Sequence, residues 1–292
     1  MRLATFSHNH KTRIGLIVES GVIDLSIAAP ELPREMIALL DLKGDNLAEL
    51  AHLADAEPHL ELHQVKLEPP VLRPGKILGI GLNYHSHAAE TNMEIPKKPV
   101  VFTKQSTSSN GPFDNVHWSE DSRILDYEGE LAVIIGKRCR RVPLDKAAIV
   151  IAGYCVANDV SVRDWQLLSS PPQFTMGKSW DTHCPMGPYI TTTDEINNPH
   201  DLHLTTHVNN EIRQDTNTND LIFNCYDLIS FLSTAFTLEP GDVILTGTPS
   251  GIGAAMQPKQ WLVAGDKVRV EIDGLGFIEN EVVKEPAGVQ CF

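Results

Sequence analysis

Three carboxylates that alternate along one short stretch constrain this chain more than any other feature of its sequence. The stretch from Asp126 to Gly136 reads DYEGELAVIIG, so Asp126, Glu128 and Glu130 stand two residues apart. Its second half, residues 131–135, is an apolar run with three β-branched residues, which predicts a buried strand. Because side chains alternate between the faces of a strand, the three carboxylates share one face. Such a cluster must share protons or surround a cation, and a solvated acidic strand end is the alternative.

The composition restricts the classes of partner. The chain has 292 residues, of which 42% are hydrophobic and 21% charged, an ordinary balance for a globular protein with a sizeable core. The net charge of −14 argues against nucleic acid or an anionic membrane as a partner. We see no signal peptide and no apolar run of the roughly 18 residues that span a bilayer. Five cysteines without C-x-x-C spacing predict reduced thiols and a cytoplasmic location.

The order of strand and helix signals predicts a strand-rich α+β fold. Strand-like runs dominate the chain and their connections are long, which does not suit a doubly wound sheet. Helical stretches are few, and are predicted over residues 34–55, just after Tyr84, near residues 145–149 and over residues 226–236.

A proline-rich segment divides the chain. The sequence KLEPPVLRPGK carries three prolines within residues 69–74, which is typical of a linker. We therefore predict a small N-terminal α+β domain over residues 1–70 and a catalytic domain over residues 71–292.

A further carboxylate for the cluster is predicted at Asp159. It ends the apolar strand IVIAGYCVAN, and strand ends commonly present functional groups to a cleft. Together, Glu128, Glu130 and Asp159 would make an all-oxygen site that suits Mg²⁺ or Mn²⁺ better than Zn²⁺. Ca²⁺ is the weaker choice, because it takes more ligands than three carboxylates supply.

A candidate general base lies upstream. His87 and Glu90 stand three residues apart in NYHSHAAE, so on a helix they share a face and the carboxylate can orient the imidazole. A solvated surface pair is the alternative, and His85 competes for the role of base.

Further polar groups could bind a substrate. Arg163, Gln166 and Lys178 follow the acidic strand and could hold a carboxylate or a developing oxyanion, although Arg163 could equally only neutralise its acidic neighbours. Thr248 stands in the glycine-flanked turn LTGTPSGIG, where a hydroxyl and open backbone amides could receive a carboxylate. A plain turn is the alternative.

Six ordered motifs over roughly residues 71–284 resemble the fumarylacetoacetate hydrolase family. The motifs are GLNYHSHAAE, DYEGELAVIIG, NDVSVRDWQ, MGKSWD, the pair Gly187-Pro188, and PGDVILTGTPSGIG. The resemblance implies a mixed β-roll with a variable N-terminal domain, and a homodimer.

The resemblance also implies roles for the residues of these motifs. It implies Glu128, Glu130 and Asp159 as metal ligands, with Asp126 next to these ligands but not bound to the metal. It implies Lys178 as a charge-stabilising group, and His87 with Glu90 as a base dyad on a mobile lid. The substrate contacts that it implies are Arg163, Gln166 and Thr248. One departure matters: the name-giving enzyme supplies another metal carboxylate from the strand that reads ILGIGLN here, which carries no acid. The chain therefore resembles the smaller three-carboxylate members, which act on short 2-oxo acids.

The resulting hypothesis is a hydrolase that cleaves a C–C bond in a 2,4-dioxo acid (an acylpyruvate or diketo acid) through an enolate held by Mg²⁺ or Mn²⁺. In this hypothesis His87 activates water and Lys178 stabilises the oxyanion. The first alternative is decarboxylation or enol–keto tautomerisation of oxaloacetate, since part of the chain is especially similar to a subgroup associated with that tautomerisation. The second alternative is a non-catalytic protein that binds a metal or a ligand.

Overall fold

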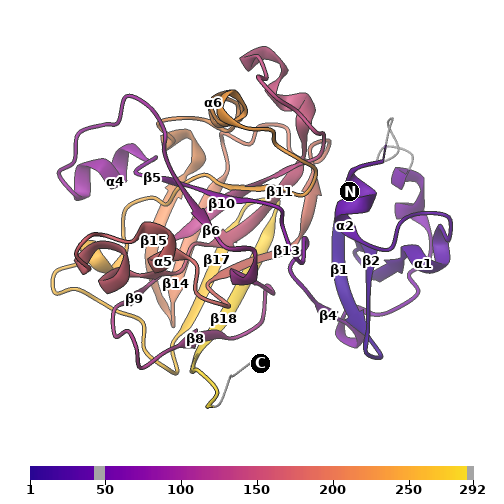
Figure 1. Ribbon diagram of the computed structural model, residues 1–292. Helices are drawn as coiled ribbons and strands as arrows, with labels where there is room; N and C mark the ends of the chain where they lie inside the picture. Colours follow the sequence, from indigo (N-terminus) through magenta and orange to yellow (C-terminus); the bar gives the residue numbers. More distant parts are fainter. Residues whose placement is uncertain (43–49, 288–292) are drawn as a thin grey trace.

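Most strands of the chain join one large mixed sheet (Figure 1). The computed structural model describes residues 1–42 and 50–287. The main path of the sheet runs β3 (Gly21–Asp24), β2 (Lys11–Val18), β1 (Arg2–His8), β13 (Cys184–Thr192), β11 (Ile151–Asn158), β10 (Gly129–Ile135), β16 (Val243–Leu245), β5 (Ile77–Gly81) and β6 (Val100–Lys104). Two short strands pair off this path, β4 (Lys66–Leu67) with β1 and β7 (Ser109–Asn110) with β13.

A second sheet packs against the first. Its order is β15 (Glu211–Asn217), β14 (His203–Val208), β17 (Lys267–Ile272), β18 (Gly276–Lys284) and β8 (Val116–Trp118), and a separate pair joins β12 (Ser161–Val162) to β9 (Leu125–Asp126). Parallel pairs such as β16 with β5 occur beside antiparallel ones. The predicted strand-rich mixed α+β fold is confirmed.

The helices are short and lie outside the sheets. They are α1 (Leu25–Ala28), α2 (Met36–Leu40), α4 (His85–Glu90), α5 (Phe174–Lys178) and α6 (Cys225–Ala235), with a π-helical turn at Asp164–Leu168 and 3-10 turns at Leu50–Asp55, Leu62–Gln64, Ser106–Ser108, Leu144–Val150, Thr218–Asp220 and Gly253–Ala255. Within the described ranges, no helix is long and apolar enough to cross a membrane.

The predicted helices are confirmed after Tyr84, where α4 forms, and over residues 226–236, where α6 forms. α6 begins at a reciprocal cap, because the Asn224 side chain accepts from Asp227 N–H while Asp227 accepts from Asn224 N–H. The helix predicted over residues 34–55 is shorter: α2 ends at Leu40, residues 43–49 lie outside the described residues, and residues 50–55 form a 3-10 turn.

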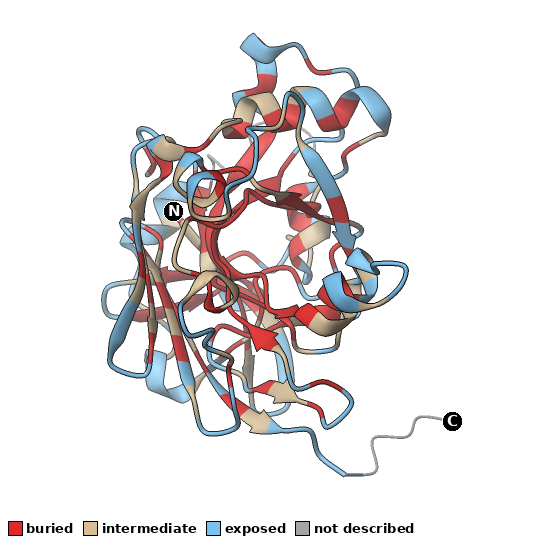
Figure 2. Cartoon of the chain, turned by 90° about the vertical axis from the view of Figure 1, so that its left-hand side faces the viewer, coloured by how far each residue is buried: buried red, intermediate tan, exposed pale blue. Residues whose placement is uncertain are grey.

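The central strands of the large sheet carry a core on each face. Leu131 and Val133 of β10 pack into the cluster that includes β17, β18 and α6. Ala132 and Ile134 point to the opposite face and join a second cluster. Both faces of β10 are therefore buried, and Figure 2 shows such buried strands at the centre with exposed residues on the outer turns.

The N-terminal residues build much of the second cluster. Leu3 and Leu16, each at most 1% exposed, pack in the same cluster as Ala132 and Ile134 of β10. β1 also pairs antiparallel with β13, so the N-terminal strands extend the sheet that contains β10.

The proline-rich segment is packed against the N-terminal strands. Thr5 Oγ1 donates a hydrogen bond to Pro70 O at 2.7 Å, and Val71 is fully buried. The domain division at residue 70 stays a prediction. The four cysteines in the described part of the chain, Cys139, Cys155, Cys184 and Cys225, are free thiols.

Candidate active site

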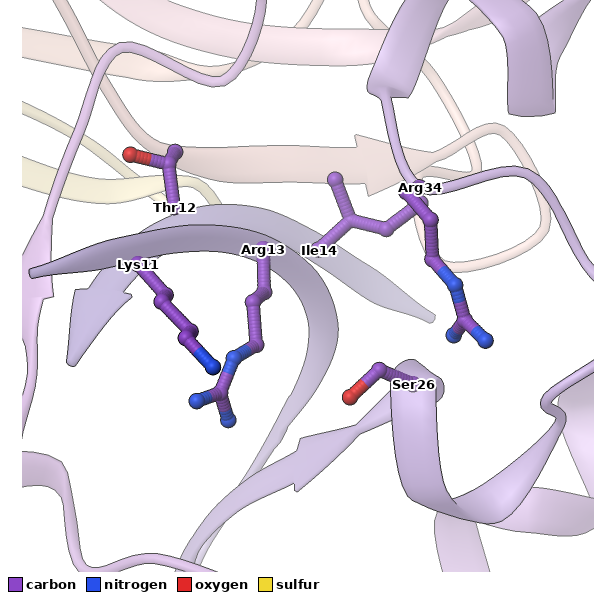
Figure 3. A pocket seen from close by; sticks show the side chains of 6 residues that line it. All are labelled: Lys11, Thr12, Arg13, Ile14, Ser26 and Arg34. Atoms are coloured by element: carbon purple, nitrogen blue, oxygen red, sulfur yellow. The ribbon is translucent and has the colours of Figure 1, made fainter. Parts of the chain in front are cut away.

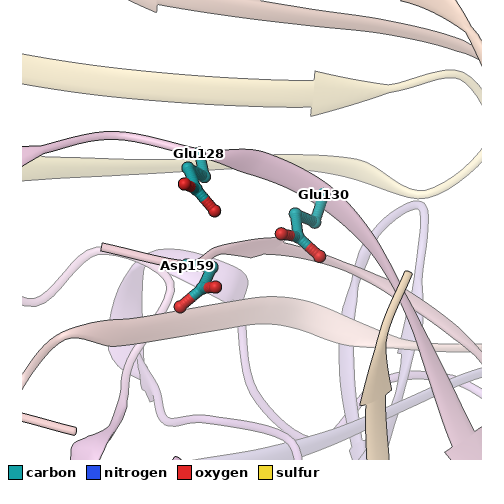
Figure 4. A group of neighbouring side chains, drawn as sticks. All are labelled: Glu128, Glu130 and Asp159. Carbon is teal, nitrogen blue, oxygen red and sulfur yellow. The ribbon is translucent and has the colours of Figure 1, made fainter. Parts of the chain in front are cut away.

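Three buried carboxylates meet where β10 and β11 pair (Figure 4). Glu128 and Glu130 flank the first residue of β10, and Asp159 directly follows β11. Glu130 stands opposite Ala157, and Asp159 N–H donates to Glu128 O at 2.8 Å, so the antiparallel register puts the three side chains on one face. One oxygen of each carboxylate lies within 4.8 Å of the others. The structure thus brings together the three residues predicted as metal ligands.

Two cations lie against this cluster. Lys178, at the end of α5, places its Nζ 2.7 Å from Glu128 Oε2 and 2.7 Å from Asp159 Oδ2. Arg163 Nη1 lies 2.7 Å from Glu128 Oε1. Burial raises the pKa of Glu128, but the ammonium and the guanidinium outweigh burial and lower this pKa to about 2. Glu128 is therefore ionised at neutral pH.

No lysine or arginine among the described residues pairs with Glu130 to offset the cost of burying its charge. Glu130 is 1% exposed. Its Oε2 accepts a hydrogen bond from Gly247 N–H at 2.6 Å. Burial, and then the carboxylates of Asp159 and Glu128, raise the pKa of Glu130 well above its ordinary value. A divalent cation would supply the positive charge that Glu130 lacks, and three carboxylates suit Mg²⁺ or Mn²⁺, so the residues present fit the metal.

Asp126 binds Arg163 and is not one of the three convergent carboxylates. Its Oδ2 accepts from Arg163 Nε at 2.9 Å and Nη2 at 2.8 Å, and backbone N–H groups of Gly253 and Ala254 donate to the same carboxylate. Arg163 Nη1 also donates to Gln166 Oε1 at 2.9 Å. Asp126 therefore fixes the guanidinium that reaches the cluster.

We expect Asp126→Asn to weaken folding more than metal binding. The amide would leave the buried Arg163 with Glu128 as its remaining carboxylate partner, and breaking a buried pair costs up to roughly 3–5 kcal/mol. Metal affinity should fall by roughly tenfold, at the lower end of the usual effect of a residue that contacts a ligand, because the three convergent carboxylates remain. Denaturant unfolding measures the first effect and calorimetry with Mn²⁺ the second. A loss of affinity as large as that of Glu128→Gln would place Asp126 among the ligands.

His87 and Glu90 form the predicted pair on α4. His87 Nδ1 lies 2.7 Å from Glu90 Oε1. An ionised carboxylate can only accept, so Nδ1 carries the hydrogen and Nε2 is the basic nitrogen. Glu90 Oε2 accepts from Gly251 N–H at 3.0 Å, which docks α4 against the loop after β16. His85 is exposed on the same helix, and the mobility of this lid stays a prediction.

Six of the nine predicted site residues line one pocket with a volume of about 300 Å³, and Glu90, Glu130 and Asp159 lie outside its lining. Its polar side chains are His87, Thr91, Glu128, Arg163, Gln166, Lys178 and Thr248. The other side chains are apolar, and they are Ile80, Leu82, Met93, Val100, Phe102, Leu167, Phe174, Ile252, Ala254 and Ala255. The pocket therefore combines a base, cations and a carboxylate with a largely apolar lining.

Thr248 is hydrogen-bonded to Gln214, a residue that no sequence motif marks. Its hydroxyl donates to Gly129 O at 3.1 Å and accepts from Gln214 Nε2 at 2.8 Å. Because its one hydrogen is used within the chain, Thr248 can only accept from a substrate in this arrangement. Gln214 Oε1 also accepts from Gly129 N–H at 2.9 Å, although its strand β15 looks polar throughout.

Lys104 is a second residue of the site that sequence reasoning misses. It ends β6, its side chain is fully buried, and its Nζ lies 2.7 Å from Asp159 Oδ1. A lysine at the end of a short strand is usually solvated, so the sequence does not mark it.

A larger hollow, of about 680 Å³, lies on the N-terminal strands and α1 (Figure 3). Its lining is Lys11, Thr12, Arg13, Ile14, Ser26 and Arg34, and Arg13 is paired with Asp24 at 2.5 Å. The lining contains no acid and no histidine, and no predicted site residue lies there. The smaller pocket is therefore the candidate active site.

Comparisons with known sequences agree over almost the whole chain. Residues 76–283 match the family model described as Fumarylacetoacetate (FAA) hydrolase C-terminal. The chain is 41% identical over 288 residues to the mitochondrial oxaloacetate tautomerase FAHD2A of Bos taurus, covering 97% of this chain and 92% of that protein. The mitochondrial oxaloacetate tautomerase FAHD2A of Homo sapiens is also 41% identical, over 289 residues and with the same coverage.

Solved structures show the same fold. The maleylpyruvate hydrolase of Sphingobium sp. SYK-6, in complex with a manganese(II) ion and pyruvate, matches with a TM-score of 0.82 and 32% identity. The fumarylacetoacetate hydrolase of Exiguobacterium antarcticum matches with a TM-score of 0.85 and 35% identity. In both comparisons 98% of this chain and 100% of the other chain are covered.

Proposed function

Because the chain belongs to the fumarylacetoacetate hydrolase family, we propose that it is a divalent-metal-dependent enzyme that interconverts the enol and keto forms of oxaloacetate. The observation that carries this proposal is the His87–Glu90 pair, because His87 lines the same pocket as Glu128 of the buried carboxylate cluster. Tautomerisation removes a proton from one atom and adds a proton to another, so it needs an oriented base and a site that tolerates enolate charge. Relatives at 41% identity are named for this reaction.

In this proposal His87 handles the proton at C3 of the substrate. Nε2 is the free nitrogen of the ring, since Nδ1 is bound to Glu90. In the direction of the enol, Nε2 takes a proton from C3, a water protonates the 2-oxygen, and the imidazolium returns its proton to the hydroxide that remains. The carboxylate of Glu90 stabilises the imidazolium that forms.

The cations of the pocket hold the negative charge of the substrate. Lys178 would stabilise the developing oxyanion, and Arg163 with Gln166 would orient a substrate carboxylate. A Mg²⁺ or Mn²⁺ ion held by Glu128, Glu130 and Asp159 would supply Lewis acidity, which makes the C3 proton more acidic.

Hydrolysis of an acylpyruvate is the second candidate. The largely apolar lining around Met93, Leu167 and Phe174 favours it, because oxaloacetate offers no apolar group to such a surface. The likeness to a maleylpyruvate hydrolase supports the same reading. In this reaction His87 would deprotonate a water that attacks the C4 carbonyl, and Lys178 would stabilise the oxyanion.

One panel of assays tests the proposal. Purified protein is given enol oxaloacetate, keto oxaloacetate and several acylpyruvates, each with Mg²⁺ and with EDTA. We expect metal-dependent loss of the enol absorbance without release of CO₂. Pyruvate with an acid would identify hydrolysis, and pyruvate with CO₂ would identify decarboxylation. A protein inert toward all of them would be the non-catalytic binding protein, for which an oriented base has no use.

The oligomeric state, the binding partners and the cellular location of the protein are also proposals. We propose a homodimer that takes a small 2-oxo acid and, given a net charge of −14, no nucleic acid and no membrane. The relatives at 41% identity carry the word mitochondrial in their names, so a cytoplasmic location stays a prediction.

A further inference from the structure

Lys104 uses its whole ammonium group inside the candidate site. Its residue is 3% exposed, and its Nζ donates to Asp159 Oδ1 at 2.7 Å, to Val160 O at 3.3 Å and to Lys178 O. An ammonium has three hydrogens, so these three acceptors satisfy it completely. These three hydrogen bonds fix the position of the buried ammonium, and they also fix the positions of the three acceptor groups.

The partners of Lys104 belong to separate segments that must meet for the site to form. Asp159 and Val160 follow β11, and Lys178 ends α5. Lys178 then reaches back with its own Nζ to Asp159 Oδ2 at 2.7 Å. The same strand as Lys104 also carries Phe102, whose ring centre lies 5.0 Å from Lys178 Nζ. Two side chains of β6 therefore contact the site: Lys104 holds Asp159 and the backbone of Lys178, and Phe102 packs against the ammonium of Lys178.

We propose that Lys104 is a positioning residue that limits Asp159 to ligation through one oxygen, so that the site prefers Mn²⁺ and Mg²⁺ over Ca²⁺. This inference rests on the metal site of the proposed function. Lys104 Nζ binds Oδ1, whereas Lys178 Nζ bridges Oδ2 to Glu128 Oε2, so Oδ2 is the oxygen of Asp159 on the side of the other carboxylates. Because an oxygen that accepts one hydrogen keeps a second lone pair, Lys104 acts by fixing the orientation of the carboxylate, with Oδ1 held beside β6 and Oδ2 directed to the ion.

Single-oxygen ligation matters because the cations differ in what they require. Mg²⁺ takes six ligands in a tight octahedron and keeps several waters, whereas Ca²⁺ takes six to eight oxygens and often binds carboxylates through both oxygens. Glu130 is restricted in the same sense, since its Oε2 accepts from Gly247 N–H at 2.6 Å. A cluster whose carboxylates offer one oxygen each is poor in ligands for Ca²⁺.

The test is calorimetric titration of Mn²⁺ and Ca²⁺ into the wild-type protein and into Lys104→Gln, with folding checked by circular dichroism. Lys104→Gln keeps a donor but removes the charge that binds Oδ1. We expect the ratio of the Ca²⁺ Kd to the Mn²⁺ Kd to fall by roughly tenfold or more. Lys104→Arg, which keeps the charge, should hold the ratio closer to that of the wild type.

Lys76→Met is the matched control. Lys76 also pairs with a buried carboxylate, Asp242 Oδ2 at 2.7 Å, but far from the carboxylate cluster in sequence and outside the lining of the pocket. In Lys76→Met the ratio of the Ca²⁺ Kd to the Mn²⁺ Kd should equal that of the wild-type protein. A merely structural lysine would lower stability in both variants and leave the ratio unchanged in both.

The outcomes separate the two hypotheses. A folded Lys104→Gln protein with the wild-type ratio overturns this inference alone. Wild-type protein that binds no Mn²⁺ overturns the proposed metal site as well. Should the Lys104 variants fail to fold, the wild-type ratio decides: a Ca²⁺ Kd at least roughly tenfold above the Mn²⁺ Kd supports the inference, and equal values overturn it.

Discussion

Replacing both glutamates of the carboxylate cluster, as Glu128→Gln with Glu130→Gln, should abolish binding of Mg²⁺ and Mn²⁺ and all metal-dependent activity. Amide groups are weaker ligands for these ions than carboxylates, and only Asp159 would keep its charge. The double change also replaces by amides the two carboxylates that share a face with Asp159 at the start of β10. Calorimetry with each metal and the enol assay with and without EDTA measure the two effects.

The control for this variant changes two glutamates that also stand two residues apart, but on another strand. Glu279 and Glu281 stand two residues apart on β18, half-buried and exposed respectively, and neither lines the pocket. Glu279→Gln with Glu281→Gln should bind metal like the wild-type protein. Metal binding that survives in the folded Glu128→Gln, Glu130→Gln protein would show that the ligands lie elsewhere.

His87→Ala should lose roughly 10²–10⁴-fold in tautomerisation, the usual contribution of a general base. Apart from the cations Lys178 and Arg163, His87 supplies the only basic nitrogen that lines the pocket in the described part of the chain, and this nitrogen is Nε2. Glu90→Gln should lose part of that factor, because it keeps the shape of the partner but removes the charge that stabilises the imidazolium. Metal affinity should not change in either variant, since neither residue belongs to the carboxylate cluster.

His85→Ala is the matched control for the base. His85 lies on the same helix but is exposed and does not line the pocket, so its loss should leave the rate unchanged. The His87→Ala protein also distinguishes the reactions when enol decay, pyruvate release and CO₂ release are followed side by side. Decarboxylation needs no base and should survive, whereas hydrolysis and tautomerisation should both fall. Full rates for both in His87→Ala would rule out the proposed base.

Residues that depend on local spacing could be predicted from the sequence. Glu128 and Glu130 share a face because strands alternate, and His87 meets Glu90 because residues three apart on a helix adjoin. Asp159 followed from its place at a strand end, and the register of β10 with β11 puts it opposite Glu128. The geometries of the Glu128–Glu130 and His87–Glu90 pairs are set within a few residues, so the sequence pattern indicates them, whereas Asp159 is placed by its position at a strand end and by the strand pairing.

Residues whose roles depend on distant pairing could not be predicted. Lys104 meets Asp159 across 55 positions of sequence, and nothing around Lys104 distinguishes it from a solvated strand end. Gln214 reaches Thr248 across 34 positions, from a second sheet. The pairing of β1 with β13 joins residues almost 190 positions apart, which no local signal indicates. The helix predicted over residues 34–55 depended on the spacing of Met36 and the following leucines, and α2 stops at Leu40.

The pairing of β1 with β13 has a consequence for how this chain could be cut or recombined. Glu130 lies on the same face of β10 as Ala132 and Ile134, whose cover comes largely from residues before the proline-rich segment. Cutting at residue 70 would uncover that apolar face and leave β13 with an open edge, both of which promote aggregation. The first 70 residues therefore cannot be exchanged like an appended module. Any graft that replaces them must supply a strand that pairs with β13 and apolar side chains that cover Ala132 and Ile134, on the face of β10 that carries Glu130.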